Sequence, residues 1–199
     1  MTTKTSRIFA ELIVTAAMVS VLAACTPDPQ PTAITSSSPS ASPSQTSFAV
    51  PAPEDESEAI DFAERTIDRF LEVRGEVNAA GGTDTDELGQ VATGPALRIA
   101  LDDAARVVEL GWKSEGALTF EPATAYAVDL VAEDGTSYPF SSVNVTGCQD
   151  GTNYTGTNPD GTPIQRPANL RAEIEFNVIW DPNLTLWLVN SIIATGATC

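Results

Sequence analysis

The chain has 199 residues and a formal net charge of −17, from 10 Lys+Arg and 27 Asp+Glu. A surface this acidic repels phosphate backbones and anionic headgroups, so we expect no nucleic-acid partner and no basic membrane patch. The sequence has no histidine, which excludes Ser-His-Asp and Cys-His catalysis and histidine zinc sites. We expect neither a cofactor nor a bound metal.

The first 25 residues have the layout of a secretory signal peptide. Lys4 and Arg7 form a short positive region, residues 12–22 are an uncharged apolar run, and two alanines then lead to Cys25. An apolar run of about 11 residues is too short to cross a bilayer as a helix, which takes about 20. The segment is therefore expected to direct export rather than to span the membrane.

Residues 22–25, Leu-Ala-Ala-Cys, resemble the lipobox of bacterial lipoproteins. The resemblance implies that residues 1–24 are removed as a signal peptide and that the Cys25 thiol carries diacylglycerol. Two acyl chains at one residue supply the two signals that stable anchoring needs. The expected location is the extracytoplasmic face of the cell membrane. The alternative is an ordinary cleaved signal peptide with an incidental cysteine.

The segment after Cys25 has the composition of a disordered tether. Residues 26–53 contain seven prolines and eleven Ser/Thr, with few apolar side chains. Such a segment buries too little apolar surface to offset the entropy lost on ordering. We therefore expect a tether over residues 25–53 and one folded domain over residues 54–199.

With Cys25 assigned to lipid, Cys148 and Cys199 remain, and in an exported domain they are expected to pair. A bridge between them would hold the C-terminus, which otherwise frays. The alternatives are two free thiols or a metal site, and a metal site would lack a third ligand.

Hydrophobic periodicity predicts three helices in the first half of the domain. The first covers Glu56 to Ala79, after a capping box and before Gly81-Gly82. Residues 84–92 form a short second helix, and Thr93-Gly94-Pro95 opens a third, which ends at Gly111. The predicted buried face of the third helix comprises Leu97, Leu101, Ala104, Ala105 and Val108.

From residue 117 the hydrophobic period changes to two, which is typical of strands. Strands are expected over residues 118–120, 124–132, 137–148, 170–180 and 185–195. Asp134-Gly135 is expected to form a hairpin turn, and residues 150–163 a loop. Because both faces of the last strand are largely apolar, the pattern places it centrally in the sheet. Helices followed by antiparallel strands predict an α+β fold, with the helices packed on one face of a curved antiparallel sheet.

The domain resembles the NTF2-like (cone-shaped, SnoaL-like) superfamily, and more closely the uncharacterised NTF2-like lipoproteins of Gram-positive bacteria. The matching features are the long first helix, Thr93-Gly94-Pro95, Val145 to Asp150, Asp160-Gly161, Trp187-Leu188-Val189 and the terminal Cys199. The resemblance implies a cone with a cavity between helices and sheet. It also implies a Cys148–Cys199 bridge.

In some members of that superfamily the cavity holds an Asp/Tyr acid–base site, and in others it only binds or assembles. The candidates by residue type are Tyr126, Asp129, Tyr138 and Asp150. None of them matches a catalytic motif of the superfamily, and cross-strand pairing explains Tyr126 and Tyr138 equally well. Trp180 and Trp187 are expected to pack in the core and at its rim.

The sequence thus predicts a membrane-anchored lipoprotein whose domain binds a small apolar ligand or an envelope protein without catalysis. The alternative is a small lyase or isomerase that uses an Asp/Tyr pair. That activity requires a carboxylate of raised pKa at the floor of the cavity. A third hypothesis is an assembly partner, such as a homodimer, that docks through the outer face of the sheet.

Overall fold

The computed structural model describes residues 50–199. The predicted signal peptide, Cys25 and most of the predicted tether lie outside the described residues. In chain order the elements are α1 (Glu56–Ala79), α2 (Leu88–Val91), α3 (Gly94–Leu110), β1 (Lys113–Glu115), β2 (Thr119–Val131), β3 (Ser137–Asp150), β4 (Thr155–Thr157), β5 (Arg171–Asp181) and β6 (Leu186–Ala194). Within this part of the chain no helix has the length and apolar character needed to cross a membrane.

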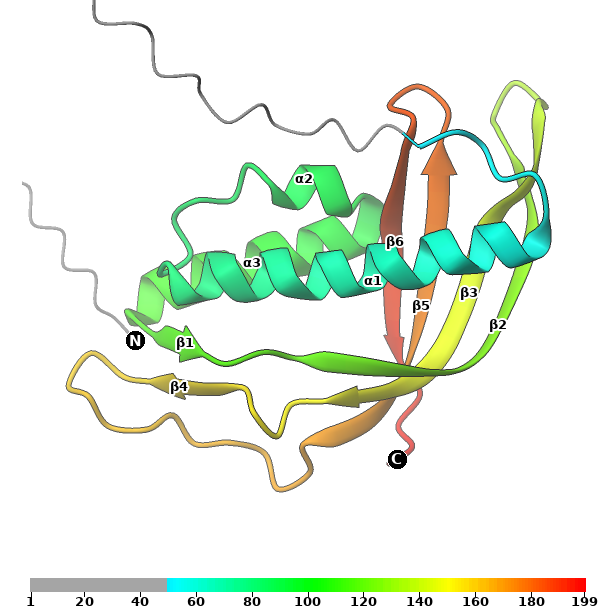
Figure 1. The fold of residues 1–199 in the computed structure, drawn as a ribbon. Helices are drawn as coiled ribbons and strands as arrows, with labels where there is room; N and C mark the ends of the chain where they lie inside the picture. The colour runs from blue at the N-terminus through cyan, green and yellow to red at the C-terminus, as the bar shows by residue number, and fades with distance from the viewer. Residues whose placement is uncertain (1–49) are drawn as a thin grey trace, which may run out of the picture. The chain divides into compact units, whose positions relative to one another are not determined.

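The helices pack on one face of a four-stranded antiparallel sheet with the strand order β2-β3-β5-β6. In Figure 1, α1 crosses this sheet, and β2 and β3 curve strongly beneath and beside it. A second, two-stranded sheet pairs β1 with β4. The predicted α+β fold, with N-terminal helices on an antiparallel sheet, is confirmed.

The ends of α1 follow from local sequence. The Asp55 carboxylate accepts a hydrogen bond from the backbone N–H of Glu58 at 2.9 Å, and the Glu58 carboxylate accepts one from the N–H of Glu54 at 2.7 Å. These bonds satisfy N–H groups at the helix start, where no intrahelical acceptor exists. The helix covers Glu56–Ala79, as predicted.

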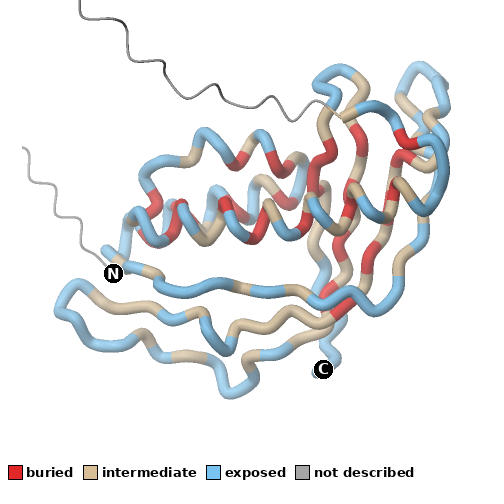
Figure 2. The backbone as a smooth tube through the Cα atoms, in the orientation of Figure 1, coloured by how far each residue is buried: buried red, intermediate tan, exposed pale blue. Residues whose placement is uncertain are grey.

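The core lies between the apolar face of α1 and the inner face of the sheet, where Figure 2 shows the buried residues facing one another. Phe176 on β5 is fully buried at its centre. Its ring makes edge contacts with Phe70 of α1 at 6.5 Å and with Phe120 of β2 at 4.9 Å between ring centroids. Edge-to-face pairs of this kind add to the free energy gained by burying apolar area.

The predicted buried face of α3 is wrong for most of its residues. Leu101 and Val108 are 38% and 50% exposed, and Ala105 is exposed. The buried residues are instead Ala96, Ala100, Ala104 and Val107. The hydrophobic periodicity predicted that the larger apolar side chains of α3 are buried. In the structure, small side chains occupy the positions where α3 packs closely against α1 and β6. Ideal Cβ geometry at Gly82, after α1, comes within 2.3 Å of the Ala104 carbonyl oxygen, which shows how close the approach is.

The prediction that the last strand is central is also wrong, because β6 forms an edge of the sheet. Its outer edge is covered by the chain between α2 and α3. Ala92 forms a parallel bridge with Val189, and the N–H of Thr93 donates to the Val189 carbonyl at 2.9 Å. Helix α3 also packs against β6, where the consecutive residues Trp187, Leu188 and Val189 are buried, whereas Ile193 near the end of the strand is 53% exposed.

The strands in the second half follow the predicted order with two differences. The two strands predicted over residues 118–120 and 124–132 are the single strand β2 (Thr119–Val131), with irregular pairing at Pro122/Thr124 and Val128/Leu130. The predicted loop over residues 150–163 contains β4, whose partner β1 was not predicted. Gly116 follows β1 at φ +83°, and any Cβ there would lie 1.8 Å from the Asn153 carbonyl oxygen. Only glycine allows this close passage.

The packed domain includes residues assigned to the tether. The N–H of Val50 donates to the Thr185 carbonyl at 2.9 Å, and the Val50 carbonyl accepts from Trp180 Nε1 at 3.0 Å. Pro53 is buried. Trp180 and Trp187 are neighbours on β5 and β6 and are 8% and 5% exposed, as expected for core and rim residues.

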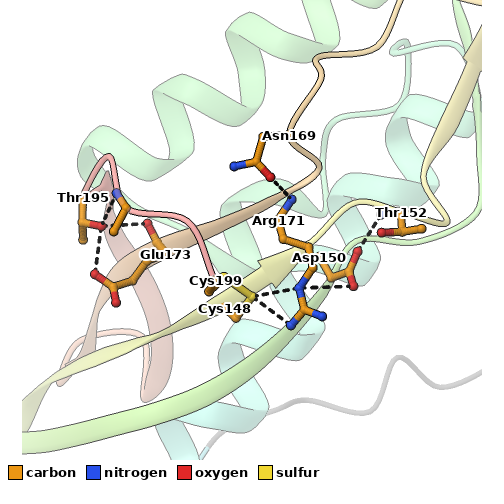
Figure 3. Close-up of a disulfide and its surroundings, with 9 residues drawn as sticks. Cys148, Asp150, Thr152, Asn169, Arg171, Glu173, Thr195 and Cys199 are labelled. Carbon is orange, nitrogen blue, oxygen red and sulfur yellow. Dashed lines mark hydrogen bonds and ion pairs between the residues drawn. A yellow bond between two sulfur atoms is a disulfide. The ribbon is translucent and has the colours of Figure 1, made fainter.

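A disulfide joins Cys148, near the end of β3, to Cys199 at the C-terminus, with 5.8 Å between the Cα atoms. Figure 3 shows Arg171 beside it, with its guanidinium 3.2 Å from Cys148 Sγ and 3.8 Å from the Asp150 carboxylate. The bridge attaches the segment after β6 to β3, across the neighbouring strand β5.

Loss of this bridge should destabilise the domain. The cysteines are 51 residues apart, and closing a loop of that length is worth about 4 kcal/mol by chain entropy. We expect Cys148→Ser with Cys199→Ser to lower the free energy of unfolding by about 2–4 kcal/mol. The measurement is urea unfolding followed by tryptophan fluorescence, compared with the oxidised parent. Identical midpoints for the parent and the double variant would contradict the prediction.

Candidate ligand cavity

A cavity of about 410 Å³ lies where the C-terminal ends of α1 and α3 face the β1–β4 pair and the ends of β3 and β5. Its lining is mixed. Trp112, Leu118, Ile164 and Leu170 supply apolar surface, and amide, hydroxyl and guanidinium groups supply the rest. A cavity of this size, apolar with a few convergent polar groups, is typical of small-molecule sites.

The spacing of polar residues along α1 and α3 brings two polar side chains from each helix to the cavity. Arg74 and Asn78 are four residues apart near the end of α1, and Asp103 and Arg106 are three apart near the end of α3. Residues at these spacings share one face of a helix. Both helices therefore present a polar pair to the cavity at the end where their buried apolar faces stop.

A chain of hydrogen bonds joins three segments around the cavity. Asn78, which is only 7% exposed, donates from Nδ2 to the Tyr154 hydroxyl at 3.1 Å. The Tyr154 hydroxyl donates to Ser114 Oγ at 3.0 Å. Helix α1, strand β1 and the start of β4 are thus tied together by neutral polar groups. Buried amides require such partners.

Two charged contacts lie at the helix side of the cavity. Arg74 forms an ion pair with Asp103, which joins α1 to α3. The Arg106 guanidinium lies over the Trp112 ring, 5.7 Å from its centroid, and Trp112 Nε1 donates to Asn158 Oδ1 at 3.1 Å. The Arg74 Nε atom is buried and has no hydrogen-bond partner among the described residues.

Arg166 lines the cavity from the segment before β5. Its guanidinium donates to the carbonyl oxygens of Gly151 and of Thr152, the latter at 3.0 Å. Both acceptors are neutral, so the positive charge of Arg166 is oriented by the loop without being cancelled. This contact fastens the segment before β5 to the end of β3.

The four candidates for an acid–base site do not lie together. Tyr126 is 54% exposed and pairs with Asn144 on the sheet, and Tyr138 pairs with Leu130 and packs against Trp180 at 5.7 Å. The predicted tyrosine pair across the hairpin is therefore wrong. The hairpin closes with Val131 opposite Ser137, so Tyr138 lies next to the turn and Tyr126 five residues before Val131, and each tyrosine faces a different neighbour.

Asp129 and Asp150 have structural partners at opposite ends of the hairpin. Asp129 stands at the irregularity between Val128 and Leu130 and accepts from the N–H of Phe140 at 3.3 Å, a group that the interrupted ladder leaves free. Asp150 accepts from the N–H of Thr152 at 2.7 Å. Hydrogen bonds from the hydroxyl and N–H of Thr152, with the charge of Arg171, lower the pKa of Asp150. Such a carboxylate is a poor general base near neutral pH.

The carboxylate geometry of the cavity differs from what a lyase or isomerase of this type requires. Asp103 is the only carboxylate in the lining, and its partner is Arg74. Partial burial raises the pKa of Asp68, but Asp68 lies outside this lining. The lining does contain one Asp and one Tyr, but Asp103 is paired with Arg74, and the Tyr154 hydroxyl is hydrogen-bonded to Asn78 and Ser114.

Sequence reasoning missed the residues that the cavity does assemble, which are Arg74, Asn78, Asp103, Arg106, Trp112, Tyr154 and Arg166. One signal was present in the sequence. Basic residues are scarce in this chain, with 10 Lys+Arg against 27 Asp+Glu. Each arginine is therefore a candidate for a functional site. Their convergence depends on contacts between distant segments, which periodicity does not report.

No family model and no curated protein matches the chain. Among solved structures, the chain is similar to the intermembrane space region of the chloroplast protein ARC6. The identity is 18%, and the match covers 66% of this chain and 95% of that chain, with a TM-score of 0.38. At that TM-score the similarity carries no argument about function.

The hydroxyl of Tyr154 should contribute to stability because it satisfies Asn78. We expect Tyr154→Phe to lower the free energy of unfolding by about 1–3 kcal/mol, since it leaves a buried amide without a partner. The matched control is Tyr126→Phe, which removes an exposed hydroxyl with no hydrogen bond among the described residues. Thermal and urea unfolding measure both variants. Equal losses for the two would show that the Asn78–Tyr154 contact contributes nothing.

Proposed function

We propose that the described domain is a non-catalytic binding module that holds a small, largely apolar ligand in the cavity between its helices and its sheet. The observation that carries the proposal is the 410 Å³ cavity itself, which apolar side chains line and whose walls are joined by side-chain hydrogen bonds. Pre-formed walls of this kind reduce the entropy lost when a ligand binds.

The anchor is the second part of the proposal. Residues 1–24 act as a signal peptide, Cys25 carries the lipid, and the Pro/Ser/Thr-rich tether after it links the membrane to the domain on the extracytoplasmic side. The Cys148–Cys199 disulfide supports this location, because disulfides persist in oxidising compartments and are rare in the cytosol. The helices-first α+β architecture, with its cavity, supports membership of the NTF2-like superfamily.

A fluorescence titration tests the cavity. Anilinonaphthalene, an uncharged probe that brightens in apolar surroundings, is titrated into the intact, oxidised protein. Ala172 lines the cavity and is half-buried, so Ala172→Phe fills part of the space. We expect the parent to bind the probe and Ala172→Phe to weaken binding about tenfold, the equivalent of about 1.4 kcal/mol.

The control is Ala105→Phe, an equal change at an exposed position of α3 that does not line the cavity. Circular dichroism confirms that both variants fold. Probe binding that is absent in the parent, or unaffected by Ala172→Phe, would contradict a binding function for this cavity.

The anchor has a separate test. Cys25→Ala removes the thiol that would be acylated, so we expect the protein to move from the membrane fraction to the soluble fraction of its host. Fractionation with an antibody against the domain measures the distribution, and mass spectrometry of the parent detects the added diacylglycerol. Unchanged membrane retention of the variant would contradict the lipid anchor.

A further inference from the structure

The distribution of charge inside the cavity is opposite to that of the rest of the domain. Outside the described range lie Lys4, Arg7, Glu11 and Asp28, which leaves 8 basic and 25 acidic residues in residues 50–199. The cavity lining contains three of these eight basic residues and one of the 25 acidic ones. Positive charge is therefore concentrated at this cavity, although the domain as a whole is acidic.

Most of this positive charge is not neutralised by the protein. Only Arg74 has a carboxylate partner, Asp103. Within residues 50–199, Arg106 makes no ion pair and contacts the face of Trp112, and Arg166 donates only to backbone carbonyls. Arg106 and Arg166 therefore each keep an uncompensated positive charge and free N–H donors. The planar guanidinium places these donors at a spacing that suits the oxygens of a carboxylate, sulfonate or phosphate.

Arg74 gives a second, independent indication that the cavity accepts a ligand with an acceptor oxygen. Its side chain is 21% exposed, and its Nε atom is buried without a hydrogen-bond partner among the described residues. A buried donor on a charged group costs free energy when it stays unpaired. An acceptor oxygen entering the cavity beside Arg74 would remove that cost.

From these contacts we propose that the cavity selects an amphiphilic organic anion, with an apolar body and one carboxylate, sulfonate or phosphate group. The inference rests on the proposed binding function and specifies its ligand class. The anionic group lies at Arg106 and Arg166, and the apolar body lies against Trp112, Leu118, Ile164 and Leu170. A bare inorganic anion would leave this apolar surface unfilled.

The test uses two probes that differ only in charge. Anilinonaphthalene sulfonate carries one sulfonate on the ring system of anilinonaphthalene, and both are titrated into the intact, oxidised protein. We expect the sulfonate to bind about tenfold more tightly than the uncharged probe, and high salt to reduce the difference. Arg106→Gln and Arg166→Gln should each reduce sulfonate affinity about five- to tenfold and leave the uncharged probe within about twofold.

Two further variants separate charge from general surface effects. Arg98→Gln removes an exposed arginine from the same helix as Arg106, but outside the cavity, and should change neither affinity. Arg106→Lys keeps the charge without the planar fork and should retain part of the preference. Loss of preference in Arg98→Gln as large as in Arg106→Gln would overturn the proposal.

The outcomes distinguish this inference from the proposed function. If both probes bind equally and the arginine variants change nothing, the cavity is a binding site without anion selectivity, and the inference is wrong. If neither probe binds, the proposed function itself fails. Displacement of the sulfonate probe by decanoate supports an amphiphilic ligand, whereas equal displacement by inorganic phosphate at the same concentration would overturn that assignment.

Discussion

The packing of Phe176 is the contact on which the rest of the domain depends. This ring, fully buried at the centre of β5, contacts Phe70 of α1 from one side and Phe120 at the start of β2 from another. To reach both, the sheet must curve around the helix, because β2 and β5 are separated by β3 in the strand order. Figure 1 shows that curvature. The cavity lies where the C-terminal ends of α1 and α3 face the β1–β4 pair.

The walls of the cavity are stabilised differently from the core. The core is apolar and close-packed, whereas the walls are joined by side-chain hydrogen bonds between segments far apart in sequence, from Asn78 to Tyr154 and from Trp112 to Asn158. Such bonds contribute little net stability each, but an unmade one is costly, so they fix geometry. The arginines therefore lie in walls whose geometry these hydrogen bonds hold in the absence of a ligand.

Features specified by local sequence could be predicted, and features that depend on distant contacts could not. The bounds of α1 follow from a capping box, a regular apolar stripe and two glycines, all within the helix and its flanks. The pairing of β1 with β4 joins three residues to three others across a long separation, with no pattern of their own. The buried face of α3 was wrong because close approach selected Ala100 and Ala104 over Leu101. The cavity residues could not be predicted either. Each is a polar side chain with no distinctive local pattern, and the set comes together only through contacts between segments far apart in sequence.

The net charge of the chain constrains large partners and small ligands in different ways. A nucleic acid meets the whole acidic surface at once, so its exclusion follows from the sum of the charges. A small anion responds mainly to charges within about 8 Å at physiological ionic strength, because solvent ions screen the more distant ones. The charged residues that line the cavity itself are Arg74, Arg106, Arg166 and Asp103. An acidic exterior is therefore compatible with an anion-selective cavity. The exterior repels polyanions, and the cavity can still hold a single anionic group whose apolar body brings it into contact.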